Sequence, residues 1–172
     1  MSNAPIIMPY KGIWPKIDPA AFVAPGAVVI GDVEIGPESS IWPGCVLRGD
    51  VHVIRIGART NIQDGTVIHV TTGGQGTHVG SGVTVGHMVV LHDCTIEDNA
   101  FVGMKSCVMD RARIKSQGML ATMGLLTAGK VISGGELWAG NPAKLWRALK
   151  PEEIAEFHHR ADHYAQLAAS YR

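Results

Sequence analysis

The chain has 172 residues, and its 15 basic and 15 acidic side chains give a formal net charge of zero. Such a balance provides no basic surface for nucleic acid or an anionic membrane, so we expect neither as a partner. The hydrophobic content of 46% predicts one domain with a sizeable core, and no apolar run reaches the roughly 18 residues of a membrane-spanning helix.

The first 16 residues, MSNAPIIMPYKGIWPK, are expected to form an N-terminal extension. They lack the charged and then apolar layout of a secretory signal. The cysteines are Cys45, Cys94 and Cys107, with no CxxC pair among them. We interpret them as reduced thiols buried as small apolar groups, which indicates a cytoplasmic protein.

An aliphatic side chain recurs at every sixth position from Ile17 onward. The first run consists of Ile17, Val23, Val29, Ile35, Ile41, Leu47 and Val53. The register then slips twice, at 56–68 and at 79–91, and a last run in steps of six spans 96–132. An amphipathic helix is excluded, because it repeats every 3.6 residues and because each interior glycine would cost it about 1 kcal/mol.

This pattern is typical of a hexapeptide repeat, in which each unit is a short strand and a turn with its aliphatic side chain inward. Three units close a triangular coil, and about seven stacked coils bury a continuous apolar column that one coil could not bury alone. We therefore predict an all-β solenoid, a left-handed parallel β-helix, over residues 17–148. The left hand is what hexapeptide families show, and the six-residue step does not itself determine it.

The repeat stops near residue 149, and the remainder, 149–172, has a helical period. Apolar residues recur at every third or fourth position from Ile154 to Tyr171. Pro151 suits a first helical turn, and Glu152 and Glu153 suit the positive end of a helix dipole. We predict a C-terminal amphipathic α-helix along the outside of the β-helix, on its own or on a neighbouring subunit.

Two histidines occupy equivalent positions in the repeat. His69 directly follows the inward residue Ile68, and His92 directly follows Leu91. If residues 70–78 form an extruded loop, these positions are one full coil apart on the same side of the prism. The two imidazoles then point outward at one edge, about 4.8 Å apart along the stack.

A third histidine, His87, lies two residues after the inward Val85, one side of the triangle earlier. It therefore faces a different edge, which in a threefold trimer meets the neighbour's edge with His69 and His92. This arrangement predicts a three-histidine metal site shared between subunits of a homotrimer. Three imidazoles with one open position are the ligand set of a catalytic Zn²⁺ site, and Fe²⁺ or Co²⁺ also accepts it.

The other histidines are interpreted as surface residues. His52 and His78 are isolated outward residues of the repeat, whereas His158, His159 and His163 fall on the polar side of the predicted tail helix.

Four segments carry a resemblance to a known family: LRGD (47–50), RIGARTNIQDGTVIH (55–69), VGHMVVLHDC (85–94) and VGMKSCVMD (102–110). They resemble the gamma-class carbonic anhydrase-like hexapeptide proteins. The resemblance implies a left-handed β-helix, a homotrimer and a zinc-dependent lyase in which metal-bound hydroxide attacks CO₂ to give bicarbonate. It also implies His69, His87 and His92 as the metal ligands.

The resemblance implies roles for five further residues. Gln63 matches the glutamine that orients the hydroxide. Arg48 and Asp50 match an ion pair at the subunit interface, where arginine can grip a carboxylate through two hydrogen bonds. Asn61 and Asp64 match residues that support the site or its turn. For Arg48, Asp50 and Gln63, a purely structural role at the interface remains open.

The sequence departs from the family pattern where protons must leave the site. Val51 stands where well-characterised members carry a glutamate, and the loop 70–78 has no carboxylate. His78, at the base of the loop, is the candidate substitute for proton transfer. Since fast hydration needs proton export, we expect slow turnover.

Two other functions remain open. One is an acyl-CoA-handling enzyme, a thioesterase or a hexapeptide acyltransferase, although the scattered Lys130, Lys144 and Arg147 form no strong phosphate motif. The other is a non-catalytic trimeric metal-binding protein.

Overall fold

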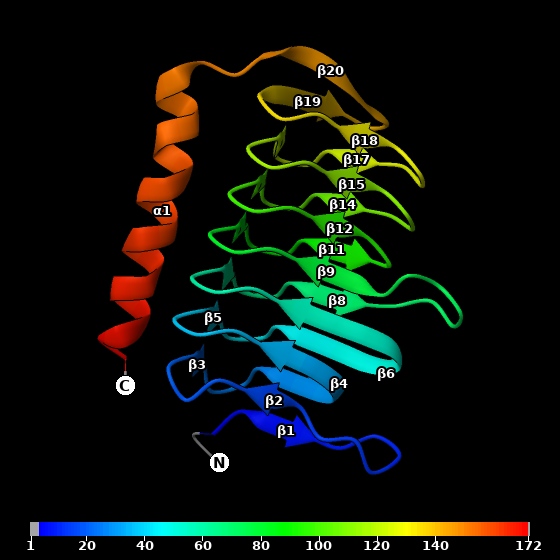
Figure 1. Ribbon diagram of the computed structural model, residues 1–172, viewed down its shortest axis with the longest axis vertical. Coiled ribbons are helices and arrows are strands. Elements are labelled where there is room, and N and C mark those ends of the chain that lie inside the picture. Colours follow the sequence, from blue (N-terminus) through cyan, green and yellow to red (C-terminus); the bar gives the residue numbers. More distant parts are fainter. Residues whose placement is uncertain (1–3, 172) are drawn as a thin grey trace.

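Short parallel strands stack in a triangular solenoid of about seven turns in the computed structural model, which describes residues 4–171 (Figure 1). The predicted fold, a parallel β-helix with a C-terminal helix, is confirmed, and the solenoid is consistent with a left-handed coil. No helix within residues 4–171 is long and apolar enough to cross a membrane.

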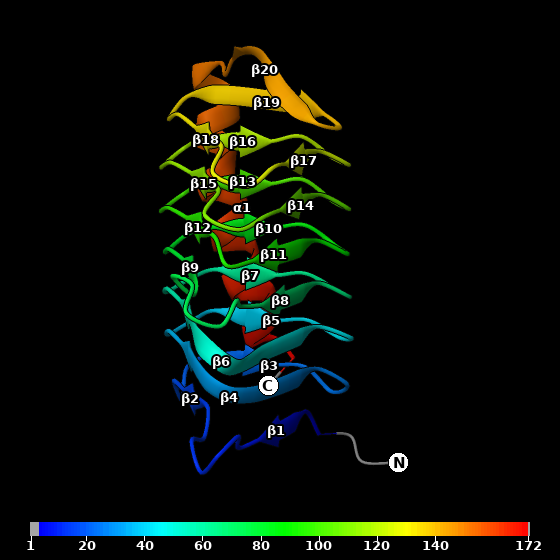
Figure 2. The ribbon, with the colours of Figure 1, turned by 90° about the vertical axis from the view of Figure 1, so that its right-hand side faces the viewer.

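The strands form three faces. Face 1 holds β1 (Ile6–Met8), β8 (Val67–His69), β11 (Val90–His92), β14 (Cys107–Val108) and β17 (Leu125–Leu126). Face 2 holds β2 (Lys16–Ile17), β9 (Thr77–Val79), β12 (Thr95–Ile96), β15 (Arg113–Ile114) and β18 (Val131–Ile132). The strands β4 (Val28–Ile35) and β6 (Val46–Ile56) run round the corner between these faces and join them into one sheet. Figure 2 shows the strands of faces 1 and 2 as two columns.

Face 3 is a separate sheet. It holds β3 (Phe22–Val23), β5 (Ser40–Ile41), β7 (Asn61–Ile62), β10 (Thr84–Val85), β13 (Phe101–Val102), β16 (Met119–Leu120), β19 (Glu136–Gly140) and β20 (Ala143–Ala148). Only the last pair in this sheet, β19 with β20, is antiparallel, and it closes the upper end of the solenoid.

The inward aliphatic residues stack directly on one another from coil to coil. On face 1, Leu47 pairs with Ile68, Ile68 with Leu91, and Leu91 with Val108, and all four side chains are fully buried. The six-residue step therefore predicted these four positions correctly, because each step carries the chain to the same position on the next side.

One position of the predicted column is wrong. Ile54, and not Val53, pairs with Val33 and is fully buried, while Val53 is half-buried. The pairing of β4 with β6 shifts after Gly31 and Gly49, because β6 carries additional residues where it turns the corner. The predicted loop after His69 is present as a protrusion between β8 and β9 (Figure 1).

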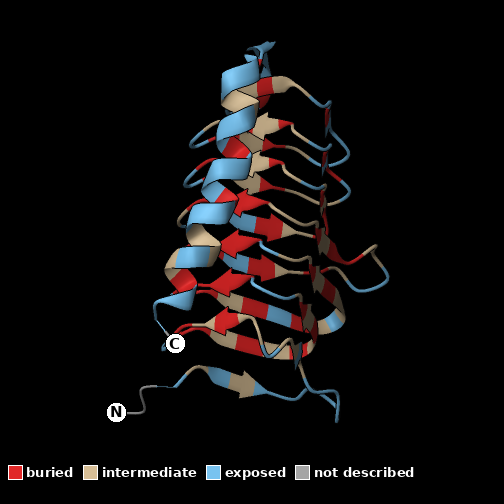
Figure 3. Ribbon diagram, turned by 60° about the vertical axis from the view of Figure 1, so that its left-hand side comes forward, coloured by how far each residue is buried: buried red, intermediate tan, exposed pale blue. Residues whose placement is uncertain are grey.

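The helix α1 (Pro151–Ala169) packs along face 3 of its own chain, with its outer side exposed (Figure 3). Phe157, Ala161 and Ala168 are its buried residues, and the ring of Phe157 stacks on Phe101 at 5.2 Å between centroids. Pro151 occupies the first turn, as the sequence predicts. At the other end of the chain, β1 lies within the segment expected as an extension and pairs with β4, so it adds a strand to face 1.

Candidate metal centre

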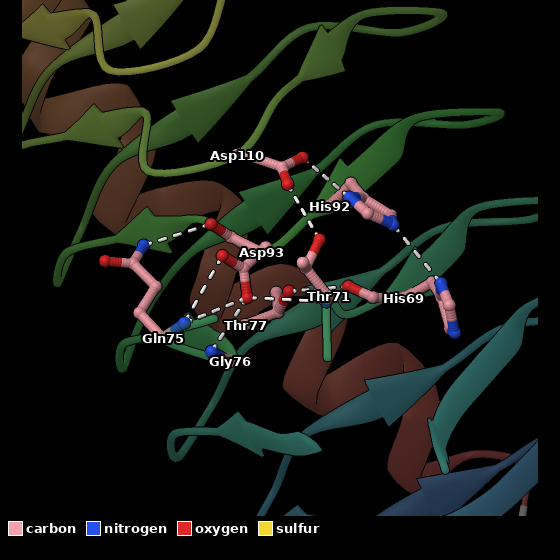
Figure 4. Close-up of polar contacts among 8 residues, drawn as sticks. All are labelled: His69, Thr71, Gln75, Gly76, Thr77, His92, Asp93 and Asp110. Atoms are coloured by element: carbon pink, nitrogen blue, oxygen red, sulfur yellow. Dashed lines mark hydrogen bonds and ion pairs between the residues drawn. The ribbon is translucent and has the colours of Figure 1, made fainter. Parts of the chain in front are cut away.

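His69 and His92 lie side by side at the corner between faces 1 and 2. They pair in register at the ends of β8 and β11, as the repeat predicts. Their ring centroids are 5.2 Å apart, and Nδ1 of His69 lies 3.2 Å from Nε2 of His92 (Figure 4).

Each of the three histidines pairs with one carboxylate. The nitrogen-to-oxygen distances are 3.1 Å from Nε2 of His69 to Asp50, 2.9 Å from Nδ1 of His87 to Asp64, and 2.7 Å from Nδ1 of His92 to Asp110. Carboxylate partners of this kind orient metal-binding imidazoles and fix their tautomers.

The environments of Asp50 and Asp110 keep both carboxyls ionised. Burial opposes ionisation of Asp50, but hydrogen bonds from Arg48 and His69 outweigh it and lower its pKa below the ordinary value. The Thr71 hydroxyl, followed by His92, lowers the pKa of Asp110. An ionised carboxylate only accepts hydrogen bonds, so each histidine nitrogen that faces one carries the proton.

In neutral imidazole rings, this assignment leaves lone pairs on the two nitrogens that face each other, Nδ1 of His69 and Nε2 of His92. Two lone pairs 3.2 Å apart repel unless a cation or a proton lies between them. Two nitrogens bound to one Zn²⁺ at about 2.0–2.1 Å in tetrahedral geometry lie roughly 3.3–3.4 Å apart. The spacing and the donor chemistry of this pair therefore fit a divalent metal ion.

His87 lies at a different corner, in the turn that connects β10 on face 3 to β11 on face 1. No group of three metal-ligating side chains forms within the described part of a single chain. One chain thus supplies two facing imidazoles at one edge and a third at another edge, as the sequence predicts.

Four of the other predicted site residues divide between the same two edges. Arg48 donates a hydrogen bond to Asp50, so this ion pair forms within one chain beside His69. Gln63 Nε2 donates to Asn61 Oδ1 at 2.9 Å, and both side chains are buried on the His87 side.

Gln63 and His87 border a cavity of about 650 Å³ between the solenoid and α1. Asn61 is held by Thr84, because its Nδ2 donates to the hydroxyl oxygen of Thr84 at 3.0 Å.

Face 1 separates these two edges and presents an apolar outer surface. Its outward residues are Ile6, Val28, Val46, Val67, Val90, Cys107 and Leu125, which align in register. The corresponding outward residues of face 2 are mostly polar or charged, such as Lys16, Glu34, Arg55 and Arg113. Face 3 is covered by α1, so face 1 is the apolar face without cover among the described residues.

Sequence reasoning missed Asp110, which contacts His92, Thr71, which contacts Asp110, and Asp93, which binds the loop backbone (Figure 4). Asp110 lies 18 residues, or one coil, after His92, and this spacing is the signal that would have identified it. His78 is engaged with the backbone oxygen of Gln75 at 3.0 Å.

Comparisons with known proteins agree with the repeat and the fold. Residues 15–49 match the family model described as bacterial transferase hexapeptide (six repeats). The chain is 46% identical over 162 residues to gamma carbonic anhydrase 1, mitochondrial, of Arabidopsis thaliana, covering 91% of this chain but 59% of that protein.

Two other proteins match over nearly their full length. A carbonic anhydrase of Geobacillus kaustophilus is 39% identical, and the match covers 97% of this chain and 91% of that protein. The crystal structure of a hexapeptide transferase family protein from Anaplasma phagocytophilum is 49% identical with a TM-score of 0.94, covering 97% of this chain and 98% of that chain. By its repeat, its fold and these relatives, the chain belongs to the gamma-class carbonic anhydrase-like family of hexapeptide-repeat proteins.

Proposed function

We propose that this protein hydrates CO₂ to bicarbonate at metal sites between the subunits of a homotrimer. His69 and His92 of one subunit and His87 of the next are the proposed ligands. The observation that carries the proposal is the pair of imidazole nitrogens that face each other at 3.2 Å, while the other nitrogen of each ring faces a carboxylate. The relatives named carbonic anhydrase support the same reaction.

The apolar surface of face 1 supports the trimer. Contiguous exposed apolar surface marks an interaction site, and face 1 lies between the two edges that carry the histidines. A neighbour packed on this face buries the apolar residues and brings its own edge toward the His69–His92 pair. A head-to-tail contact of this kind closes into a ring when its rotation is threefold.

Zn²⁺ is the metal we propose, and Fe²⁺ or Co²⁺ suits the same imidazole set. When bound, the metal lowers the pKa of a coordinated water to about 7 and so supplies a nucleophile at neutral pH. The carboxylates of Asp50, Asp64 and Asp110 keep the proton on the histidine nitrogen that faces each of them, Nε2 in His69 and Nδ1 in His87 and His92. The other nitrogen of each ring is then free to bind the metal.

The remaining predicted residues have supporting roles in the proposal. Arg48 holds Asp50 ionised and oriented toward His69. Gln63, fixed by Asn61, is the residue that would orient the nucleophile.

Proton export is expected to limit the rate. Two carboxylates contact the loop after His69, and both are engaged. Asp93 is 2% exposed and accepts hydrogen bonds from the loop backbone, and Asp110 accepts hydrogen bonds from Thr71 and His92. A carboxylate held in this way does not exchange protons readily with solvent, so we expect slow hydration.

Metal quantification and a stopped-flow CO₂ assay on the metal-loaded protein test the proposal together. We expect one metal per subunit and measurable hydration. Mixed His69→Ala and His87→Ala subunits, refolded together, should recover part of the metal content that each variant lacks alone, whereas a mixture of His69→Ala and His92→Ala should not. No recovery in the first mixture contradicts a site shared between subunits.

An acyl-CoA-handling enzyme is the second candidate, because a structural neighbour at 49% identity is named a hexapeptide transferase family protein. An acyl-CoA hydrolysis and transfer panel, run with metal and after its removal, distinguishes the two. Activity that survives metal removal favours this candidate, and bound metal with neither activity favours a non-catalytic trimer. A cytoplasmic location stays a prediction, since several relatives are named mitochondrial.

A further inference from the structure

The protruding loop 70–76 is connected to the ring of His92 by two side-chain hydrogen bonds through Asp110, and its backbone N–H groups donate to Asp93 (Figure 4). Nothing in the proposed reaction requires this loop to contact the substrate. Its side chains include no carboxylate, and yet its backbone and one of its hydroxyls are held in specific contacts.

Asp93, which is buried, holds the loop through its backbone, including the N–H of Thr71 at 3.5 Å. Its carboxylate oxygen Oδ1 accepts the backbone N–H groups of Gln75 at 3.1 Å and Gly76 at 2.9 Å. The side-chain amide of Gln75 donates to the backbone oxygen of Asp93 at 3.1 Å. Charge-assisted bonds to a buried carboxylate are strong, so Asp93 fixes the loop on the coil that carries His92.

Thr71, at the start of the loop, makes the next contact. Its hydroxyl donates to Oδ2 of Asp110 at 2.7 Å, while Oδ1 of the same carboxylate accepts Nδ1 of His92 at 2.7 Å. Both oxygens of Asp110 are thus engaged, which fixes the plane of the carboxylate. The carboxylate in turn fixes the plane of the His92 imidazole, which donates a hydrogen bond to it.

We propose that Thr71 is a positioning residue for the metal, and that Asp93 holds Thr71 in place by fixing the loop 70–76. The inference rests on the proposed function, in which His92 is a metal ligand. Hydrogen bonds that orient metal-binding histidines influence metal affinity by about 10- to 100-fold, and Thr71 acts one contact further out.

Thr71→Val tests this role because it removes the hydroxyl and preserves the shape of the side chain. We expect about a tenfold loss of Zn²⁺ affinity by chelator competition and a changed absorption spectrum of the Co²⁺-loaded protein. Thr71→Ser retains a hydroxyl and should therefore retain the wild-type Zn²⁺ affinity and the wild-type Co²⁺ spectrum. Thr72→Val, the same substitution at the exposed neighbouring position, should match the wild type.

Gly74→Ala disturbs these contacts from the side of Asp93. A Cβ at Gly74 would lie 2.3 Å from Oδ1 of Asp93, so the loop must shift although Thr71 and Asp110 are intact. We expect a lower Zn²⁺ affinity and a changed Co²⁺ spectrum, as for Thr71→Val. Equal affinities and spectra for Thr71→Val, Thr72→Val and the wild type would overturn the inference.

A measurement without metal separates this inference from the proposed function. In the metal-free protein, ¹⁵N histidine spectra should show His92 protonated on Nδ1, with a mixture of tautomers in Thr71→Val. If the wild type binds no metal, the proposed function fails and these spectra decide the positioning role. A mixed tautomer in the wild type overturns that role.

Discussion

The three histidines differ in the ring nitrogen that their carboxylates engage: His69 is held through Nε2, whereas His87 and His92 are held through Nδ1. The nitrogen left for a metal therefore differs between neighbouring ligands. Repeat phase alone predicted that His69 and His92 share an edge, because it fixes where each Cα lies. It could not predict the engaged nitrogens, which depend on side-chain rotation and on partners such as Asp110, one coil away.

Replacing His92 by alanine should remove the metal and leave the solenoid folded. The side chain points outward and is only half-buried, so its loss opens no cavity in the core. Elemental analysis should find less than a tenth of the wild-type metal, with an unchanged far-UV circular dichroism spectrum. Retention of one metal per subunit would exclude His92 as a ligand.

Asp64→Asn tests the opposite edge of the same proposed site. It weakens the contact that holds His87, so we expect metal affinity to fall by about 10- to 100-fold. Asp162→Asn is the matched control, because that exposed carboxylate of α1 pairs with Arg59 of the solenoid and with none of the three histidines. Chelator competition on both variants gives the comparison, and equal affinities would show that Asp64 does not support the site.

At the scale of the elements, the solenoid depends on one inward residue per step. Ile132 is fully buried in β18, while its neighbour Val131 is 42% exposed. Ile132→Ala should lower the free energy of unfolding by about 2–5 kcal/mol, and Val131→Ala by well under about 1 kcal/mol. Denaturant unfolding of both variants measures the difference, and similar losses would contradict the assigned core column.

The start of α1 should be sensitive to acid. Hydrogen bonds from the Arg147 guanidinium and the Lys150 N–H lower the pKa of Glu153 to about 2, from 4.5. A depressed folded-state pKa means that the stabilisation is complete above about 4.5 and is lost as the pH falls toward 2. Between these values the wild type should lose more stability than Glu153→Gln in thermal unfolding, and parallel pH profiles would refute this role.

Sequence periodicity predicted the elements unequally. The core column and the tail helix followed from spacing, because both depend on apolar residues returning to one side. The corner in β6 did not, since the inward position moves from Val53 to Ile54 where the strand passes from face 1 to face 2. Because β6 carries additional residues at this corner, the six-residue step alone could not show whether Val53 or Ile54 points inward.

At the scale of the whole molecule, the outward residues of face 1 decide whether the two halves of the site meet. A glutamate at Val90 would place a charge in the middle of the proposed interface, where its desolvation is unfavourable. We expect Val90→Glu to be monomeric by light scattering and to lose its metal, although His69, His87 and His92 are all retained. Thr95→Glu puts the same charge on face 2 of the same coil and should stay trimeric with its metal. A trimeric, metal-loaded Val90→Glu would place the interface elsewhere, and the three imidazoles would then need another way to converge.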